Sequence, residues 1–113
     1  MARKKKPKEI EFSIHWTEEA IDSLWSTWEW LAERNEKAAE ALDSLVEKKV
    51  LRLLEYPYSG PIVPELLDLE EYRQILLSKN HRLLYRVDDE TGYIWILLIQ
   101  PTRLPLSRFL GEP

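Results

Sequence analysis

Residues 10–16 alternate apolar and polar side chains, beginning with Ile-Glu-Phe-Ser. A period of two over this length predicts a half-buried β-strand. Thr17 follows where a helix N-cap belongs, and Glu18 and Glu19 suit the positive end of a helix dipole. The pattern therefore predicts a strand that runs directly into a helix.

Two helices are indicated by apolar residues that recur every three or four positions. The first helix is expected to end near Arg34 or Asn35, and the second to span about residues 36–55. The apolar stripe of the first helix consists of Ala20, Ile21, Leu24, Trp25, Trp28, Leu31 and Ala32. The stripe of the second helix consists of Ala38, Ala41, Leu42, Leu45, Val46, Val50 and Leu53. Because only a short polar connection separates the two helices, they should form an antiparallel hairpin.

The second half of the chain changes to short alternating runs that are typical of a β-sheet. Pro57 and Gly60 end the second helix, because proline cannot continue it and glycine admits conformations that other residues resist. Three strands are then predicted at residues 72–78, 82–87 and 93–100, separated by polar turns. The last strand is apolar on both faces, which predicts a central position in the sheet.

The order of these elements predicts an α+β fold of two layers. It consists of an N-terminal strand, a helical hairpin and then an antiparallel three-strand meander, with the hairpin on one face of a mainly antiparallel sheet. The residues expected in the core are Leu24, Trp28, Leu45, Leu53 and Ile96. We expect residues 9–113 to form a single domain, preceded by a basic and flexible segment at residues 1–8.

The composition limits the class of protein further. A chain of 113 residues with 44% hydrophobic content can close one core but not two ordinary domains. It has no apolar run of the roughly 20 residues that a membrane helix needs, and no hydrophobic signal segment follows its basic start. We therefore expect a cytoplasmic protein without membrane contact. Cysteine is absent, and His15 and His81 cannot complete a metal shell alone, so no metal or other cofactor is expected.

The positions of the charged residues are more informative than the net charge. A net charge of −4 argues against a protein that coats nucleic acid with its whole surface. Residues 72–87, however, contain basic side chains and no Asp or Glu. The candidates for binding an anionic target or an acidic protein are Arg73, Lys79, Arg82, Arg86 and Arg103, and Arg108 extends the series. The alternative interpretation is that these side chains are merely solvated.

Short motifs follow one another along the chain at characteristic spacings. They are the Trp-Thr-Glu-Glu-Ala start of the first helix, Leu-Glu-Tyr-Pro-Tyr-Ser-Gly at residues 54–60, Val-Pro-Glu-Leu at 63–66, Tyr-Arg at 72–73, His-Arg-Leu-Leu-Tyr-Arg-Val at 81–87, and Ile-Leu-Leu-Ile at 96–99 leading to Thr102 and Arg103. In this order they resemble the RelE/ParE family of toxins from toxin-antitoxin systems. The similarity covers residues 10 to about 103, and it implies the fold that periodicity predicts independently.

The resemblance implies two possible activities, because members of the family share one fold but differ in chemistry. ParE-like members are implied to inhibit DNA gyrase, and this is our leading hypothesis. RelE-like and YoeB-like members are implied to cleave messenger RNA on the ribosome, without a metal. A third alternative is an inactive or engineered member that keeps only the antitoxin-binding fold.

The nuclease alternative has two candidate catalytic residues. Glu65 resembles the position of the glutamate base in YoeB-like toxins, and Arg82 resembles their phosphate-binding arginine. RNA cleavage also needs an acid for the leaving oxygen. Where those nucleases place a histidine or tyrosine, this chain has Gln100, which cannot shuttle protons at neutral pH. We therefore assign no residue a catalytic role and favour gyrase inhibition.

Trp30 is the candidate for contact with a partner protein. It lies off the apolar stripe of the first helix, in a chain with five tryptophans, and exposed aromatic side chains often anchor interfaces. The resemblance implies a cognate antitoxin whose C-terminal segment wraps the toxin. The alternative is that Trp30 covers a loop or the basic N-terminal segment.

Overall fold

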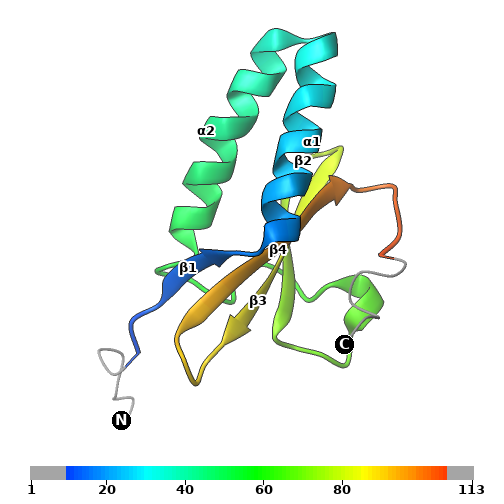
Figure 1. Cartoon of the computed structure of the whole chain (residues 1–113). Coiled ribbons are helices and arrows are strands. Elements are labelled where there is room, and N and C mark those ends of the chain that lie inside the picture. The colour runs from blue at the N-terminus through cyan, green and yellow to red at the C-terminus, as the bar shows by residue number, and fades with distance from the viewer. Residues whose placement is uncertain (1–9, 107–113) are drawn as a thin grey trace.

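The computed structural model describes residues 10–106, so the basic segment 1–8 and Arg108 lie outside the described residues. Its elements are β1 Ser13–Trp16, α1 Glu18–Arg34, α2 Glu36–Arg52, the 3-10 helix η2 Pro64–Leu66, β2 Tyr72–Ser78, β3 His81–Asp88 and β4 Tyr93–Pro101. The two helices lie side by side over one face of the sheet (Figure 1). The predicted two-layer α+β fold is confirmed.

The four strands form one sheet in the order β1-β4-β3-β2. β1 runs parallel to β4, whereas β4, β3 and β2 form the predicted antiparallel meander. β4 therefore has a neighbouring strand on each side, which is the central position that its apolar sequence predicted.

The ends of the helices follow from two capping residues. The Thr17 side chain accepts a hydrogen bond from the Ala20 amide at 3.0 Å, as the sequence predicted for an N-cap. Asn35 is the single residue between α1 and α2, and its side chain accepts from the Ala38 amide at 3.2 Å. The hairpin is tight because one residue ends the first helix and caps the second.

Two boundaries differ from the sequence prediction. β1 begins at Ser13 rather than at Ile10, because its partner strand β4 begins at the residue paired with Ser13. α2 ends at Arg52 rather than near residue 55, since the next amides donate to carbonyls three residues back and tighten the last turn. Pro57 favours this earlier end, because its ring would clash with the Leu53 carbonyl if the α-helix continued.

The core between the helices and the sheet contains Leu53 and Ile96, as predicted. Leu24, Trp28 and Leu45, which were also predicted as core residues, are only partly buried and pack against its margin. Trp30 on α1 is 49% exposed, in agreement with its position off the apolar stripe of this helix.

The contact between α1 and the sheet is narrower than the apolar stripe suggested. α1 buries Ala20 and Thr27, and the Thr27 hydroxyl is satisfied because it donates to a carbonyl one turn earlier at 2.8 Å. Small side chains at the contact let the helix approach the sheet closely. Because each residue turns the helix by about 100°, Ile21 and Trp25 fall on its flank, where Trp25 is 61% exposed.

Gly60 and Tyr85 fasten the loop after α2 to the sheet. Tyr85 is fully buried on β3, and its hydroxyl accepts a hydrogen bond from the Gly60 amide at 3.0 Å. Burial raises the pKa of this hydroxyl, so it stays neutral. A Cβ at position 60 would overlap the carbonyl oxygen of Gln74 and lie 2.8 Å from the Tyr85 hydroxyl. Glycine is needed here because two chain segments approach closely.

Candidate functional site

The strand pattern directs Arg82 away from the helices. Leu83, Tyr85 and Val87 of β3 belong to the core on the helical side of the sheet. Side chains alternate across a strand, so Arg82 points to the opposite face. Arg82 is nevertheless only 5% exposed. The open face of the sheet, which is the face without helices, is covered at this end by η2 and by the segment after β4.

A bulge in β4 brings Gln100 to the same face. The pairing between β3 and β4 shifts between Leu84 and Tyr85, which pair with Leu98 and Ile96, so Leu97 is the extra residue. One inserted residue reverses the facing of the rest of a strand. Gln100 consequently lies opposite Arg82 in the register.

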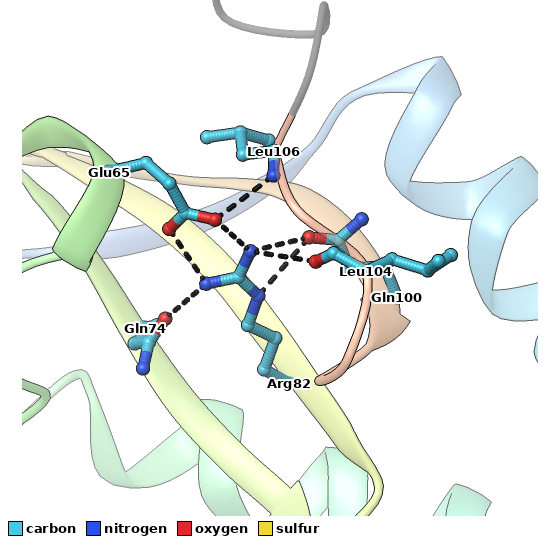
Figure 2. Close-up of polar contacts among 6 residues, drawn as sticks. All are labelled: Glu65, Gln74, Arg82, Gln100, Leu104 and Leu106. Carbon is cyan, nitrogen blue, oxygen red and sulfur yellow. Dashed lines mark hydrogen bonds and ion pairs between the residues drawn. The ribbon is translucent and has the colours of Figure 1, made fainter.

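Arg82 lies at the centre of a polar cluster, which we call the Arg82 cluster (Figure 2). Its Nη1 and Nη2 donate to the two carboxylate oxygens of Glu65 at 3.1 and 2.8 Å. Nη1 also donates to the Gln74 side-chain oxygen at 2.8 Å. Nε and Nη2 donate to the Gln100 side-chain oxygen at 3.1 and 2.7 Å, and Nη2 approaches the Leu104 carbonyl oxygen at 3.4 Å. All three guanidinium nitrogens therefore point at protein oxygens.

The Glu65 carboxylate is held from two sides. Besides the bidentate pair with Arg82, it accepts a hydrogen bond from the Leu106 amide at 3.0 Å. The hydrogen bond from Arg82, opposed by partial burial and assisted by the Leu106 amide, lowers the pKa of Glu65 to about 2. The cluster thus ties η2, β2, β3, β4 and the segment after β4 to one another, around a carboxylate that stays ionised.

The lowered pKa of Glu65 predicts an acid-sensitive contribution to stability. A carboxyl group whose pKa is lower in the folded chain stabilises the fold fully above its ordinary pKa of 4.5, and this stabilisation is lost as the pH falls toward 2. We expect urea unfolding, followed by tryptophan fluorescence, to show wild type more stable than Glu65→Gln at pH 6. The difference should shrink progressively between pH 5 and pH 2. A difference that does not change over this range would contradict the pairing with Arg82.

The Arg82 cluster is poorly suited to proton transfer. A general base works best with a pKa near the working pH, whereas the pKa of Glu65 is about 2 and both of its oxygens already accept hydrogen bonds. The third position holds the amide of Gln100, which neither gives up nor takes a proton at neutral pH. Its oxygen instead accepts from Arg82.

The predicted basic residues do not gather on one surface. The charge of Arg82 is paired with Glu65 inside the cluster. Arg73 lies at the edge of the sheet, where it donates to the carbonyls of Glu70 and Gly60 at 2.7 and 3.2 Å and lies over the Tyr58 ring. Arg86 sits toward the other end of β3, opposite Trp95.

Lys79 and Arg103 belong to one end of the molecule. The Thr102 hydroxyl donates to the Lys79 carbonyl at 3.1 Å, and the Thr102 amide donates to the Asn80 carbonyl at 2.8 Å. These bonds join the β2–β3 turn to the end of β4. His81 lies at the same end, half-buried, with its ring edge-on to Trp30 at 6.4 Å between centroids. Burial lowers the pKa of His81.

Within residues 10–106 no group of three or more His, Cys, Asp or Glu side chains is placed to hold a metal ion. The same part of the chain has no helix of the length and apolar character needed to cross a membrane.

The sequence matches the family model of the ParE toxin of the type II toxin-antitoxin system parDE over residues 14–103. This range includes α1, α2, β2, β3, β4, all of β1 except Ser13, and the four side chains of the Arg82 cluster. The chain therefore belongs to the ParE toxin family of type II toxin-antitoxin systems. No curated protein sequence matches it significantly.

Solved structures share the fold at low sequence identity. The chromosomal ParDE toxin-antitoxin system of Pseudomonas aeruginosa is 20% identical with a TM-score of 0.62, covering 80% of this chain and 96% of that chain. A mutant of the Escherichia coli toxin RelE in the free state is 19% identical with a TM-score of 0.58, covering 91% and 94%. A YoeB/ParE toxin from Agrobacterium tumefaciens is 15% identical with a TM-score of 0.55, covering 80% and 98%.

Sequence reasoning missed several partners in this region. It identified Glu65 and Arg82 but not Gln74, which has no distinguishing motif. It also treated Gln100 as the absence of an acid rather than as a ligand of Arg82. The bulge at Leu97 was the missing information, because an uninterrupted alternation would have turned Gln100 toward the helices.

Proposed function

We propose that this toxin acts by binding and inhibiting DNA gyrase and that a cognate antitoxin neutralises it. The observation that carries the proposal is the state of the Arg82 cluster. The only carboxylate in it has a pKa of about 2 and is held by Arg82, and the neighbouring position is an amide. An assembly of this kind supports the fold but offers no acid and base pair for cutting RNA.

The antitoxin partner follows from family membership. The model that matches the chain describes the toxin of a type II toxin-antitoxin system, and the Pseudomonas aeruginosa structure is a ParDE toxin-antitoxin system. A small protein encoded beside the gene for this chain is the expected antitoxin.

The second candidate function is ribosome-dependent cleavage of messenger RNA. It is favoured by one observation, the retained pair of Glu65 and Arg82 at 2.8 Å. The structural likeness to both RelE and ParDE does not decide between the two, since one fold supports both activities.

Controlled expression in bacterial cells separates the two functions. Gyrase inhibition should induce DNA damage signalling and filamentous growth while amino-acid incorporation continues. Ribosome-dependent cleavage should instead stop incorporation within minutes and leave truncated messages. Co-expression of the antitoxin is the control, because it should restore growth in either case. Early arrest of protein synthesis without DNA damage signalling would contradict the proposal.

Removal of positive charge from the surface should weaken binding to gyrase if the contact surface of gyrase is acidic. Unlike Arg73 and Arg82, the candidates Lys79, Arg86 and Arg103 donate no side-chain hydrogen bond to another residue among 10–106. The double variant Lys79→Gln, Arg86→Gln removes two of these charges and should lower gyrase affinity about tenfold, mainly through slower association. The matched control removes two charges from α2, as Lys48→Gln, Arg52→Gln. Equal affinities for the two double variants, measured by surface plasmon resonance on immobilised gyrase, would rule out these residues as target contacts.

A further inference from the structure

The open face of the sheet carries three aromatic side chains at the end where β3 turns into β4. His15 pairs with Trp95 in the register between β1 and β4. The residues that precede these two, Ile14 and Ile94, pack on the helical side of the sheet. Because side chains alternate across a strand, His15, Tyr93 and Trp95 point away from the helices. The His15 and Tyr93 rings stack at 3.9 Å between centroids, and the Trp95 ring lies 5.2 and 5.9 Å from them. We call these three residues the aromatic face.

The aromatic face is partly exposed to solvent. Tyr93 is 39% exposed, and His15 and Trp95 are half-buried. The segments that cover the open face lie at its other end, over Arg82. The three rings contact one another, and the Ser13 hydroxyl lies 2.8 Å from Nε2 of His15, so their orientations are set before any partner binds. Ordered aromatic side chains at a surface lose little conformational entropy on binding and are typical of a contact site.

Two opposite charges lie beside the aromatic face on β3. Arg86 is opposite Trp95 and Asp88 is opposite Tyr93 in the register between β3 and β4, so both side chains belong to the open face. Arg86 forms no ion pair and donates no side-chain hydrogen bond to another residue among 10–106. Asp88 accepts hydrogen bonds from two amides of the following turn at 3.0 and 3.4 Å, and both reach the same oxygen, Oδ1. The other carboxylate oxygen is therefore available to a cation.

These five side chains are complementary to themselves under a twofold axis. An axis that runs across the strands, midway between Arg86 and Asp88, places the row of Arg86 and Trp95 over the row of Asp88 and Tyr93 in a second copy. Each Arg86 then faces an Asp88, and each indole faces a phenol ring. Every such pairing occurs twice in a symmetric contact. The covered ends around Arg82 point away from each other in this arrangement, so they do not obstruct the approach of the two faces.

The local charge disfavours nucleic acid as the occupant of the aromatic face. Aromatic side chains beside an arginine stack nucleobases in many proteins. Here, however, the adjoining turn contributes Asp88, Asp89 and Glu90, and the chain has a net charge of −4. Phosphate groups would be repelled by these carboxylates. A second copy of the chain, in contrast, brings a carboxylate to each Arg86 and an arginine to each Asp88.

We propose that the aromatic face is the interface of a symmetric homodimer. Two copies pack their open sheet faces together with their β3 strands running in opposite directions, and Arg86 of each copy pairs with Asp88 of the other. The contact covers one end of one sheet face and is smaller than a standard interface, so the Kd should be on the order of 10 µM. This proposal does not depend on the proposed function.

Sedimentation equilibrium of the purified chain, at concentrations below and above the expected Kd, tests the proposal. Wild type should change from monomer to dimer. Trp95→Ala should raise the Kd at least about tenfold, because it removes a central aromatic contact. Trp25→Ala is the matched control, since Trp25 is 61% exposed on α1 and lies outside the aromatic face. It should change the Kd by less than about twofold.

A mixing experiment tests the pairing of charges. Arg86→Asp alone places carboxylates opposite carboxylates, and Asp88→Arg alone places arginines opposite arginines, so each variant should remain monomeric. An equimolar mixture restores both pairs of opposite charge and should form a heterodimer. Asp88 also fastens the turn after β3, so thermal unfolding is measured for each variant. If Asp88→Arg is unfolded, Arg86→Asp is compared with Lys48→Asp, a charge reversal on α2 that should leave the dimer intact.

Three results would overturn the proposal. The first is a wild-type chain that remains monomeric at all concentrations. The second is a dimer that Trp25→Ala dissociates and Trp95→Ala does not, because the interface would then lie on the helices. The third is a monomer that binds fluorescein-labelled single-stranded DNA and loses this binding on Trp95→Ala. That result would identify nucleic acid as the occupant of the aromatic face.

Discussion

Replacement of Glu65 by alanine should lower the free energy of unfolding by about 2 kcal/mol, below the loss typical of a fully buried ion pair, because Arg82 is buried whereas the side chain of Glu65 is 31% exposed. Arg82 is only 5% exposed, so it cannot turn to water when its counter-ion is removed. The Gln74 and Gln100 oxygens would remain as its neutral partners. Urea unfolding at pH 7 measures the change.

Two companion variants make the Glu65 prediction specific. Glu70→Ala removes an exposed carboxylate from the same acidic loop and should cost less than about 0.5 kcal/mol. The double variant Glu65→Ala, Arg82→Met removes the stranded charge as well, so it should be more stable than Glu65→Ala alone. If Glu65→Ala and Glu70→Ala are equally stable, the Arg82 cluster does not support the fold.

Replacement of Gly60 by alanine should destabilise the chain by about 3 kcal/mol, at the upper end of the cost of overpacking. The added Cβ would meet the backbone carbonyl of Gln74, which cannot move without distorting β2, and it would push against the Tyr85 hydroxyl. Thermal unfolding followed by circular dichroism measures the loss.

Tyr85→Phe separates the steric effect at Gly60 from the lost hydrogen bond. It removes the acceptor for the Gly60 amide while keeping the ring, and should cost about 1 to 2 kcal/mol, as for a buried donor left without a partner. Gly60→Ala should be clearly less stable than Tyr85→Phe. The opposite order would mean that the loop after α2 does not approach the sheet as closely as described.

The fold could be predicted from the sequence because its signals are local. The alternation around Ser13, the cap at Thr17, the periodicity of the helices and the change to short strands after Gly60 each act over a few residues. The exposure of Trp25 could not be predicted, because it depends on how closely α1 approaches β4. A periodic stripe gives the direction of the core but not the width of the contact.

The Arg82 cluster shows why only part of a site is visible in a sequence. Glu65 and Arg82 occur in recognisable motifs, and both belong to the cluster. Gln74 and Gln100 come from other strands, and the bulge at Leu97 decides which face Gln100 takes. The cavity of about 760 Å³ between the helical hairpin and the sheet was not predicted at all, since it is lined by residues of α1, α2, β2, β3 and β4. Trp30 was the one sign of it in the sequence.

These contacts give Glu65 and Arg82 a structural explanation in this chain. A bidentate pair with four further hydrogen-bond partners fixes η2 and the segment after β4 on the open face of the sheet. Such a role accounts for both residues without requiring that they act on RNA.

The most direct test of gyrase inhibition uses the purified chain in two parallel assays. One measures supercoiling of relaxed plasmid by DNA gyrase, and the other measures cleavage of messenger RNA on programmed ribosomes. We expect inhibition of supercoiling in proportion to the amount of protein, with the messenger RNA intact. Cleavage of the message that Glu65→Gln abolishes, with supercoiling unaffected, would contradict this expectation.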